Sequence, residues 1–378
     1  MLLRHTRIPI PPRPRKTKVP KRGLEPPILT EHGSEPCAST ISPLRLLPRK
    51  ILTEKGKISY NIMSNFWQKT KKPIIGLAPM DGVTDFPMRE IQCQITKPDV
   101  LFTEFISAEG FIRKPDVFEK TLYFEENQRP VVAQIFGYTP EAFYETISQI
   151  IKKNFDGIDI NMGCPAKSVL GKGGGGALIG NYKLVKKIIL ESLKAIKKSK
   201  KNIPLSVKTR IGINNNVTEE WISFLSAFPL AEITVHGRLL INNHKGEVDW
   251  EKIAKAAEIL KKKKIICLGN GGIKSVKEAN IICQKYNLDG VLIGQAALGN
   301  PWVFMEDYCP TKEEILKTIL KHAKYVEEFY PPERFITVYK HFGWYPKGFK
   351  NCKDLKIELM KTKNYAEVKQ VIAKFSQF

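Results

Sequence analysis

The clearest segment of the 378-residue sequence reads Gly157-Ile158-Asp159-Ile160-Asn161-Met162-Gly163-Cys164-Pro165. Its first four residues form a short run rich in isoleucine, and β-branched side chains favour a strand. Asn161 follows this run, and Cys164 then lies in a turn of glycine and proline. The segment therefore predicts a strand whose end carries functional side chains.

Seven further runs of this kind occur along the chain, with starts 25 to 47 residues apart and helical patterns between them. Strands that alternate with helices indicate βα units and a parallel sheet. Eight such units over about 230 residues match a (β/α)₈ barrel better than an open doubly wound sheet. The expected strands are 74–78, 100–103, 131–135, 157–160, 204–208, 232–235, 265–268 and 290–293.

A functional side chain lies at or just after the end of each predicted strand. A barrel collects the carboxyl ends of its strands on one face, where its sites form. So many groups at one rim indicate a broad ligand with donors and acceptors around its edge. In chain order the groups are Met80, Glu104, Gln134, Asn161, Lys208, His236, Asn270 and the pair Gly294-Gln295.

The pattern changes after Pro310. Helical periodicity at 313–329, 353–361 and 365–375, without a clear strand, predicts a compact helical domain over 311–378. Its basic residues surround an aromatic group, which suits nucleic acid binding. The alternative is that the aromatic side chains form the domain's core and the lysines are merely exposed. The residues are Lys340, His341, Lys347, Lys350, Lys353 and Lys356 around Phe342, Trp344, Tyr345 and Phe349.

The chain is strongly basic, with 61 Lys and Arg against 38 Asp and Glu. Residues 1–62 hold 13 basic residues, 4 acidic ones and 10 of the 25 prolines, so we expect a disordered extension without assigned function. A start of translation at Met63 is an alternative. Residues 63–378 keep a net charge of +14. A folded region this basic attracts a polyanion such as nucleic acid. The alternative is that the lysines are merely exposed to water on the surface.

The cysteines and the hydropathy exclude several classes of protein. There are seven cysteines and no Cys-x-x-Cys pair, so neither a disulfide scaffold nor a metal site is expected. This usage indicates a reducing compartment, and we expect the protein in the cytoplasm. No apolar stretch approaches eighteen uncharged residues, so no membrane partner is expected either.

Cys164 is the strongest candidate for chemistry. Most lone cysteines are small core side chains, but a position just past a strand end places this one at the barrel rim. Lys167 and Lys172 lie close enough in sequence to stabilise its thiolate or to bind a phosphate. The glycine run at 173–176 permits either close approach of the backbone to a neighbour or movement of a lid.

The last two strands predict a phosphate site. Gly269-Asn270-Gly271-Gly272 and Gly294-Gln295 place small residues at strand-to-helix turns, where such barrels hold phosphate. Lys208 ends the fifth strand, and a cation in the barrel mouth requires an anionic partner. The electron-rich N1/O2 edge of a reduced flavin is such a partner, and His236 lies where it donates to the same ligand. His244, His322 and His341 lack such positions, so we expect them to be surface or structural residues.

Taken together, these residues resemble the tRNA-dihydrouridine synthase family, FMN-dependent reductases that saturate the C5–C6 bond of uridines in tRNA. The likeness runs from about residue 72 to the C-terminus. The matching pieces, in order, are Ala78-Pro79-Met80-Asp81-Gly82-Val83-Thr84-Asp85, Gln134, Asn161-Met162-Gly163-Cys164-Pro165, Val207-Lys208-Thr209-Arg210, Val235-His236-Gly237-Arg238, Gly269-Asn270-Gly271-Gly272, Gly299-Asn300-Pro301-Trp302 and His341-Phe342-Gly343-Trp344-Tyr345.

The resemblance implies a role for each matching position. Residues 63–310 would form the FMN-binding barrel, and Cys164 would be the proton donor. The expected cofactor-binding residues are Ala78, Pro79, Met80, Asp81 and Gln134 at the flavin ring, Lys208 and His236 at its pyrimidine edge and ribityl chain, and Asn270, Gly271, Gly272, Gly294 and Gln295 at its phosphate. The expected substrate-binding residues are Asn161, Lys167, Arg210 and Arg238.

The resemblance also implies partners, and two departures from it matter. NADPH or NADH would be the reductant and tRNA the substrate, bound by the helical domain; we expect a monomer without an obligatory protein partner. The family usually has Arg where Gln295 stands and an aromatic Tyr where His244 stands. Two other functions stay open: an FMN reductase of a free pyrimidine such as dihydroorotate, and a non-catalytic RNA-binding barrel.

Overall fold

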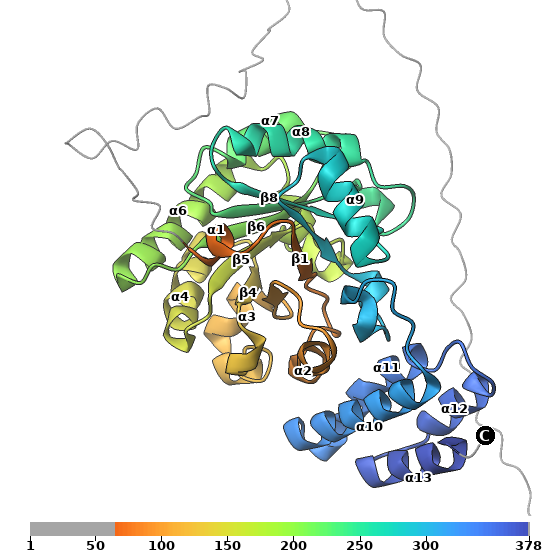
Figure 1. The fold of residues 1–378 in the computed structure, drawn as a ribbon. Coiled ribbons are helices and arrows are strands. Elements are labelled where there is room, and N and C mark those ends of the chain that lie inside the picture. The colour runs from red at the N-terminus through yellow and green to blue at the C-terminus, as the bar shows by residue number, and fades with distance from the viewer. Residues whose placement is uncertain (1–64, 377–378) are drawn as a thin grey trace, which may run out of the picture. The chain divides into compact units, whose positions relative to one another are not determined.

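Short strands alternate with helices through most of the computed structural model, which describes residues 65–376 (Figure 1). The predicted extension over 1–62 and the alternative start at Met63 lie outside the described residues. Within the described part of the chain, no helix is both long and apolar enough to span a bilayer.

The eight predicted strands are present and form one parallel sheet, in the order β1-β9-β8-β7-β6-β5-β4-β2. The backbone closes this sheet into a barrel, because Leu77 N donates to Val100 O at 3.0 Å and Asp99 N donates to Ile75 O at 3.1 Å. The strands are β1 (Ile74–Leu77), β2 (Leu101–Phe102), β4 (Val131–Phe136), β5 (Gly157–Met162), β6 (Leu205–Arg210), β7 (Glu232–His236), β8 (Ile266–Asn270) and β9 (Gly290–Ile293). The two-residue strand β3 (Ile106–Ser107), which was not predicted, pairs with β4. The predicted (β/α)₈ barrel is therefore confirmed.

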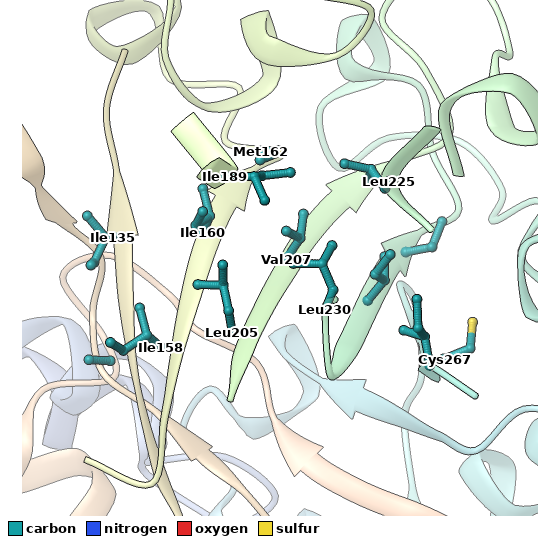
Figure 2. Close-up of a cluster of buried hydrophobic side chains, with 14 of the residues drawn as sticks. Ile135, Ile158, Ile160, Met162, Ile189, Leu205, Val207, Leu225, Leu230 and Cys267 are labelled. Atoms are coloured by element: carbon teal, nitrogen blue, oxygen red, sulfur yellow. The ribbon is translucent and has the colours of Figure 1, made fainter. Parts of the chain in front are cut away.

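Alternate residues of each strand point out of the barrel and pack against the helices. Figure 2 shows these outward side chains on β4 to β8 together with Ile189 and Leu225, and all belong to one buried apolar cluster. The helices follow their strands in chain order: α2 (Phe86–Ile95), α3 (Ala108–Arg113), α4 (Pro140–Ile150), α5 (Lys167–Leu170), α6 (Tyr182–Ser199), α7 (Thr218–Leu225), α8 (Trp250–Lys261) and α9 (Val276–Tyr286).

The other alternate residues point into the barrel, and they differ from one side to the other. On β1, β2, β8 and β9 they are apolar or glycine except for Asn270 at the end of β8, and Trp67 of the short helix α1 (Phe66–Lys69) joins the apolar ones near the amino ends of the strands. On β5, β6 and β7 they are polar or charged, including Asp159, Lys208 and Glu232. Apolar side chains therefore close the interior at one end, and polar and charged side chains line one of its walls.

The chain after the barrel is helical and has a core of its own. Its helices are α10 (Lys312–Phe329), α11 (Tyr339–Trp344), α12 (Cys352–Leu359) and α13 (Tyr365–Ser376), which gather together (Figure 1). Phe342 and Tyr345 are fully buried in this core. These two aromatic side chains therefore serve packing and are not exposed for bases to stack on. His322 and His341 are buried here too, with His322 Nδ1 2.8 Å from the Tyr345 hydroxyl.

Several contacts join this helical region to the barrel. The Tyr330 hydroxyl donates to Asp85 Oδ2 at 3.3 Å, and Asp85 Oδ1 accepts from Met88 N at the start of α2. The Phe329 ring lies against Phe86, with ring centroids 4.7 Å apart. Asp85 ends the Asp81-to-Asp85 turn after β1, so the helical region contacts a segment that leads directly to the barrel mouth.

Candidate active site

A cavity of about 860 Å³ opens at the carboxyl ends of the strands. This volume is within the range of small-molecule and cofactor sites. Among its lining residues are four cations and a single acid, Asp81. The excess of positive charge favours an anionic ligand. The cations are Lys208, Arg210, Arg238 and Lys274.

A chain of hydrogen bonds fixes the Cys164 loop to the barrel wall. Asn161 Oδ1 accepts from Cys164 N at 2.9 Å and from Gly163 N at 3.0 Å. Asn161 Nδ2 donates to Gln134 Oε1 at 3.0 Å, and Gln134 Nε2 donates to Asp159 Oδ2 at 2.7 Å. The amide of Asn161 therefore orients the loop, and Gln134 orients Asn161.

The Cys164 side chain lines the cavity with 9% of its surface exposed. Burial raises the pKa of its thiol, and the charge of Asp81 raises it further. The Ala166 amide, Arg210 and Lys208 lower this pKa, but burial outweighs them. The thiol is therefore protonated at neutral pH, which is the form that a proton donor requires.

Arg210 holds two loops beside the thiol. Its Nε donates to Gly163 O at 2.8 Å and its Nη1 to Asn243 O at 2.7 Å. Only 2% of Arg210 is exposed, and burial lowers the pKa of its guanidinium to about 10. Arg210 thus ties the Cys164 loop to the 239–243 loop, while its guanidinium also lines the cavity.

The glycine run at 173–176 packs directly on the Cys164 loop. Gly176 N donates to Cys164 O at 3.1 Å, and a Cβ at Gly176 would lie 2.3 Å from a Leu240 methyl carbon. Gly175 has φ +57°, and a Cβ there would lie 3.0 Å from Cys164 O. Of the two sequence interpretations, the structure supports close approach of the backbone.

Lys208 of β6 and Asn270 of β8 meet in the barrel mouth. Lys208 Nζ donates to Asn270 Oδ1 at 2.8 Å, and Asn270 Nδ2 donates to Leu292 O at 2.9 Å. Burial, with repulsion from Arg210, lowers the pKa of Lys208 to about 8. Asn270 therefore holds in the cavity an ammonium that has no direct carboxylate partner among residues 65–376.

Beyond Lys208, His236 and Arg238 face the glycines that follow β8. Arg238 Nη1 lies 3.2 Å from His236 Nε2, so this nitrogen accepts and the ring proton is on Nδ1. Burial lowers the pKa of His236, as do Lys208, Arg210 and Arg238, so its ring is neutral. Gly271 has φ +126°, and a Cβ there would lie 2.9 Å from the His236 ring. Only glycine permits this approach.

A cluster of acidic side chains, with one lysine close to it, lies on the side of the barrel mouth that β1 and β2 form. Burial raises the pKa of Glu104 to about 7 and also raises that of Asp81. Lys340 of α11 lowers both, and its Nζ is 3.6 Å from the position of a Cβ on Gly82. The helical region thus contributes a cation to the rim of the barrel.

Comparisons with known proteins identify the family of this chain. The family model described as Dihydrouridine synthase (Dus) matches residues 76–378. This chain belongs to the dihydrouridine synthase family. The resemblance seen in the sequence is therefore confirmed, and the protein is an enzyme of the oxidoreductase class.

Curated relatives cover most of the chain. A "Probable tRNA-dihydrouridine synthase" of Staphylococcus aureus (strain COL) is 32% identical over 320 residues, which cover 82% of this chain and 95% of the relative. A "Probable tRNA-dihydrouridine synthase 2" of Bacillus subtilis (strain 168) is 30% identical over 322 residues, covering 83% and 97%. A solved old yellow enzyme homologue from Zymomonas mobilis aligns with a TM-score of 0.42 at 14% identity, over 61% of this chain and 87% of its own.

The structure brings most of the predicted site residues of this dihydrouridine synthase family member to one cavity. Two do not line it. Gln134 is fully buried and reaches the site only through Asn161, and Lys167 is exposed on α5. The predicted residues that line the cavity are Ala78, Pro79, Met80, Asp81, Asn161, Cys164, Lys208, Arg210, His236, Arg238, Asn270, Gly271, Gly272, Gly294 and Gln295.

The cavity of this family member also contains residues that sequence reasoning did not assign to it. His244 was expected to be a surface or structural residue, but it lines the cavity and stacks on His236, with ring centroids 6.1 Å apart. Its place depends on the path of the 239–246 loop, which carries no periodic signal. Phe105 directly follows Glu104, a strand-end residue, so its position offered a signal. The further lining residues Asn243 and Lys274 also lie in loops.

Proposed function

We propose that this protein is a tRNA-dihydrouridine synthase that reduces the C5–C6 double bond of uridines in tRNA. FMN is the proposed cofactor, NADPH the proposed reductant and Cys164 the proposed proton donor. The observation that carries the proposal is that Cys164, Lys208 and Asn270 line one cavity at the carboxyl ends of the strands.

The residues of the cavity fit FMN. Lys208 offers an ammonium to an electron-rich ring edge, and Asn270 holds it there at 2.8 Å. The glycines at 271, 272 and 294, with Arg238 nearby, fit a phosphate, because backbone amides and a guanidinium favour anions. Bound and reduced by NADPH, FMN would supply the hydride that the reaction requires.

The protein's own contribution to the chemistry is a proton donor held in a fixed position. Addition of hydride to C6 of uracil leaves negative charge at C5 and O4, and that charge requires a proton. Cys164 holds one, because burial keeps its thiol protonated. The hydrogen bond that Asn161 accepts from the Cys164 loop, and the one that Arg210 donates to it, keep the thiol at a fixed place in the cavity wall. A positioned acid of this kind contributes about 10²- to 10⁴-fold to a rate.

A uridine inside folded tRNA must leave its stack to reach the cavity, at a cost of roughly a few kcal/mol. The exposed lysines of the helical region offer phosphate contacts that would offset this cost. We therefore propose that tRNA binds across the cavity mouth and the helical region over 311–378. Because the buried aromatic side chains of that region form its core, its lysines would contribute more than its aromatics.

The direct test is to purify the protein and measure three properties: flavin absorbance, NADPH oxidation, and dihydrouridine in unmodified tRNA. We expect a yellow protein that forms dihydrouridine only in tRNA. Turnover of a free pyrimidine nucleotide without tRNA would indicate the free-pyrimidine reductase instead. A colourless protein that binds tRNA and forms no dihydrouridine would indicate the non-catalytic alternative. Mapping dihydrouridine in tRNA from cells that lack the gene would identify the modified position.

A further inference from the structure

The polar wall of the barrel interior holds two carboxyl groups and one ammonium on three neighbouring strands. Asp159 of β5 and Glu232 of β7 are both opposite Ser206 of β6, and Lys208 lies two residues further along β6. Neither Asp159 nor Glu232 has any exposed surface. Neither lines the cavity, so the proposed reaction uses neither carboxyl directly.

Hydrogen bonds distinguish the two carboxyl groups. Asp159 accepts from Ser206 Oγ at 2.7 Å and from Gln134 Nε2 at 2.7 Å, one bond for each oxygen. Glu232 Oε1 accepts from Thr234 Oγ1 at 2.6 Å, while the buried Glu232 Oε2 has no partner among the described residues. Because hydrogen bonds stabilise a charged carboxylate, negative charge is held better on Asp159 than on Glu232.

The surrounding charges lead to the same assignment. Asp159 and Lys208 influence the charge of Glu232 electrostatically, as does Asp289 before β9, while the outward-pointing thiol of Cys267 on β8 is influenced in turn by Glu232 and Asp289. Asp289 is already paired with Lys72. Lys208 alone can balance one buried carboxylate, and a second one without a partner would be costly. Burial raises the pKa of Asp159 to about 6 and raises that of Glu232 well above its usual range.

We propose that Asp159, Lys208 and Glu232 form a buried charge triad in which Asp159 carries the negative charge that balances Lys208 and Glu232 carries a proton at neutral pH. The triad is a positioning device. Asp159 stabilises the ammonium of Lys208 before any anionic ligand arrives, and the neutral Glu232 avoids a surplus of negative charge beneath the site. The proposal goes beyond the proposed function, because it concerns the protein without substrate.

The first experiment compares the full-length protein with its Glu232→Gln variant by urea unfolding at pH 6 to 8. In the unfolded chain Glu232 is ionised over this range, while in the folded protein it keeps its proton. A raised folded pKa means that its stability contribution falls as pH rises. The unfolding constant of the native protein, relative to Glu232→Gln, should therefore rise up to about tenfold per pH unit. A ratio that stays constant within about twofold across this range would overturn the proposal.

The second experiment locates the proton by infrared spectroscopy. At pH 7 we expect a protonated-carboxyl C=O band of Glu232 that shifts when glutamate alone carries ¹³C and is lost in Glu232→Gln, in addition to a contribution from Glu104, whose pKa is about 7. Glu104→Gln is the control, since it should leave this band in place. A band that shifts only with ¹³C-aspartate would place the proton on Asp159 and contradict the assignment. Glu232→Met removes the acid without a polar replacement. If neither Glu232 variant folds at pH 6, the protein needs a charge at Glu232 and the proposal is wrong.

Discussion

Lys208 is a cation whose charge depends on pH within a range that is easy to measure. Burial lowers its pKa to about 8, so it is charged below that pH and increasingly neutral above it. An anionic ring edge binds better to the charged form, since a hydrogen bond to a charged group contributes roughly 1.5 to 3 kcal/mol. The FMN site that we propose should therefore weaken in alkaline solution.

The corresponding measurement is the dissociation constant of FMN from pH 6.5 to 9.5, followed by quenching of flavin fluorescence. We expect affinity to fall as pH rises through about 8. In Lys208→Met, affinity should be about 10- to 150-fold weaker at pH 7, and this pH step should be absent. Lys172→Met, which is exposed outside the cavity, is the control. An unchanged pH profile in Lys208→Met would mean that another group causes the step.

Gln295 is the second residue whose chemistry can be tested alone. It is exposed at the cavity edge beside Gly294, where the family usually has arginine. Gln295→Arg should tighten FMN binding by about tenfold, because it adds a charge-assisted hydrogen bond to phosphate. Riboflavin lacks the phosphate, so its affinity should stay the same. Equal tightening of both ligands would show that Gln295 does not lie at the phosphate.

At the scale of elements, the contact between the helical region and the barrel depends on Gly299. This residue has φ +61°, and a Cβ there would lie 2.4 Å from the backbone carbon of Trp344 at the end of α11. Gly299→Ala should therefore lower the free energy of unfolding by about 2 to 4 kcal/mol, since both strain and overpacking are costly. Urea unfolding measures this loss.

Gly180→Ala is the matched control for Gly299→Ala. Gly180 has φ +81°, but no atom lies within 4 Å of the place that a Cβ would occupy there, so only the backbone strain of about 1 kcal/mol should appear. The difference between the two variants measures the clash with α11. If both variants lose the same stability, the helical region does not press on Gly299 as the structure indicates.

How much the sequence could predict depends on the element. The eight barrel strands and helices α10, α12 and α13 were predictable, because their periodic patterns are long or recur at regular spacing. The two-residue β3 and the six-residue α11 are too short for such a signal, and packing determines them. Strand-end positions such as Lys208 and Asn270 followed from the barrel topology. The position of His244 could not be predicted because it lies in a loop, and the burial of Gln134 depends on its partners Asp159 and Asn161.

For the whole molecule, the excess of positive charge predicts how tRNA binding responds to salt. If the exposed lysines of the helical region bind phosphates, affinity falls linearly with the logarithm of salt concentration. Replacing Lys347, Lys350 and Lys353 by alanine should reduce that slope by about two to three units, since each phosphate contact contributes nearly one. Filter binding at several salt concentrations measures the slope.

A second triple variant is the control that separates binding at the helical region from an effect of net charge. Lys261, Lys262 and Lys263 are exposed at the end of α8 on the barrel and carry the same total charge. Their replacement by alanine should leave the slope nearly unchanged. If the two triple variants reduce the slope equally, tRNA responds to net charge and the helical region is not its specific binding surface.

The most direct test of the proposed reaction is the rate of dihydrouridine formation in unmodified tRNA. The rate is compared between the native protein and Cys164→Ala, both loaded with FMN and supplied with NADPH. We predict that the variant retains its flavin absorbance and forms dihydrouridine about 10²- to 10⁴-fold more slowly, while Cys309→Ala, an exposed cysteine outside the cavity, matches the native rate. Dihydrouridine formed at the native rate by Cys164→Ala would contradict the assignment of a buried thiol as the proton donor.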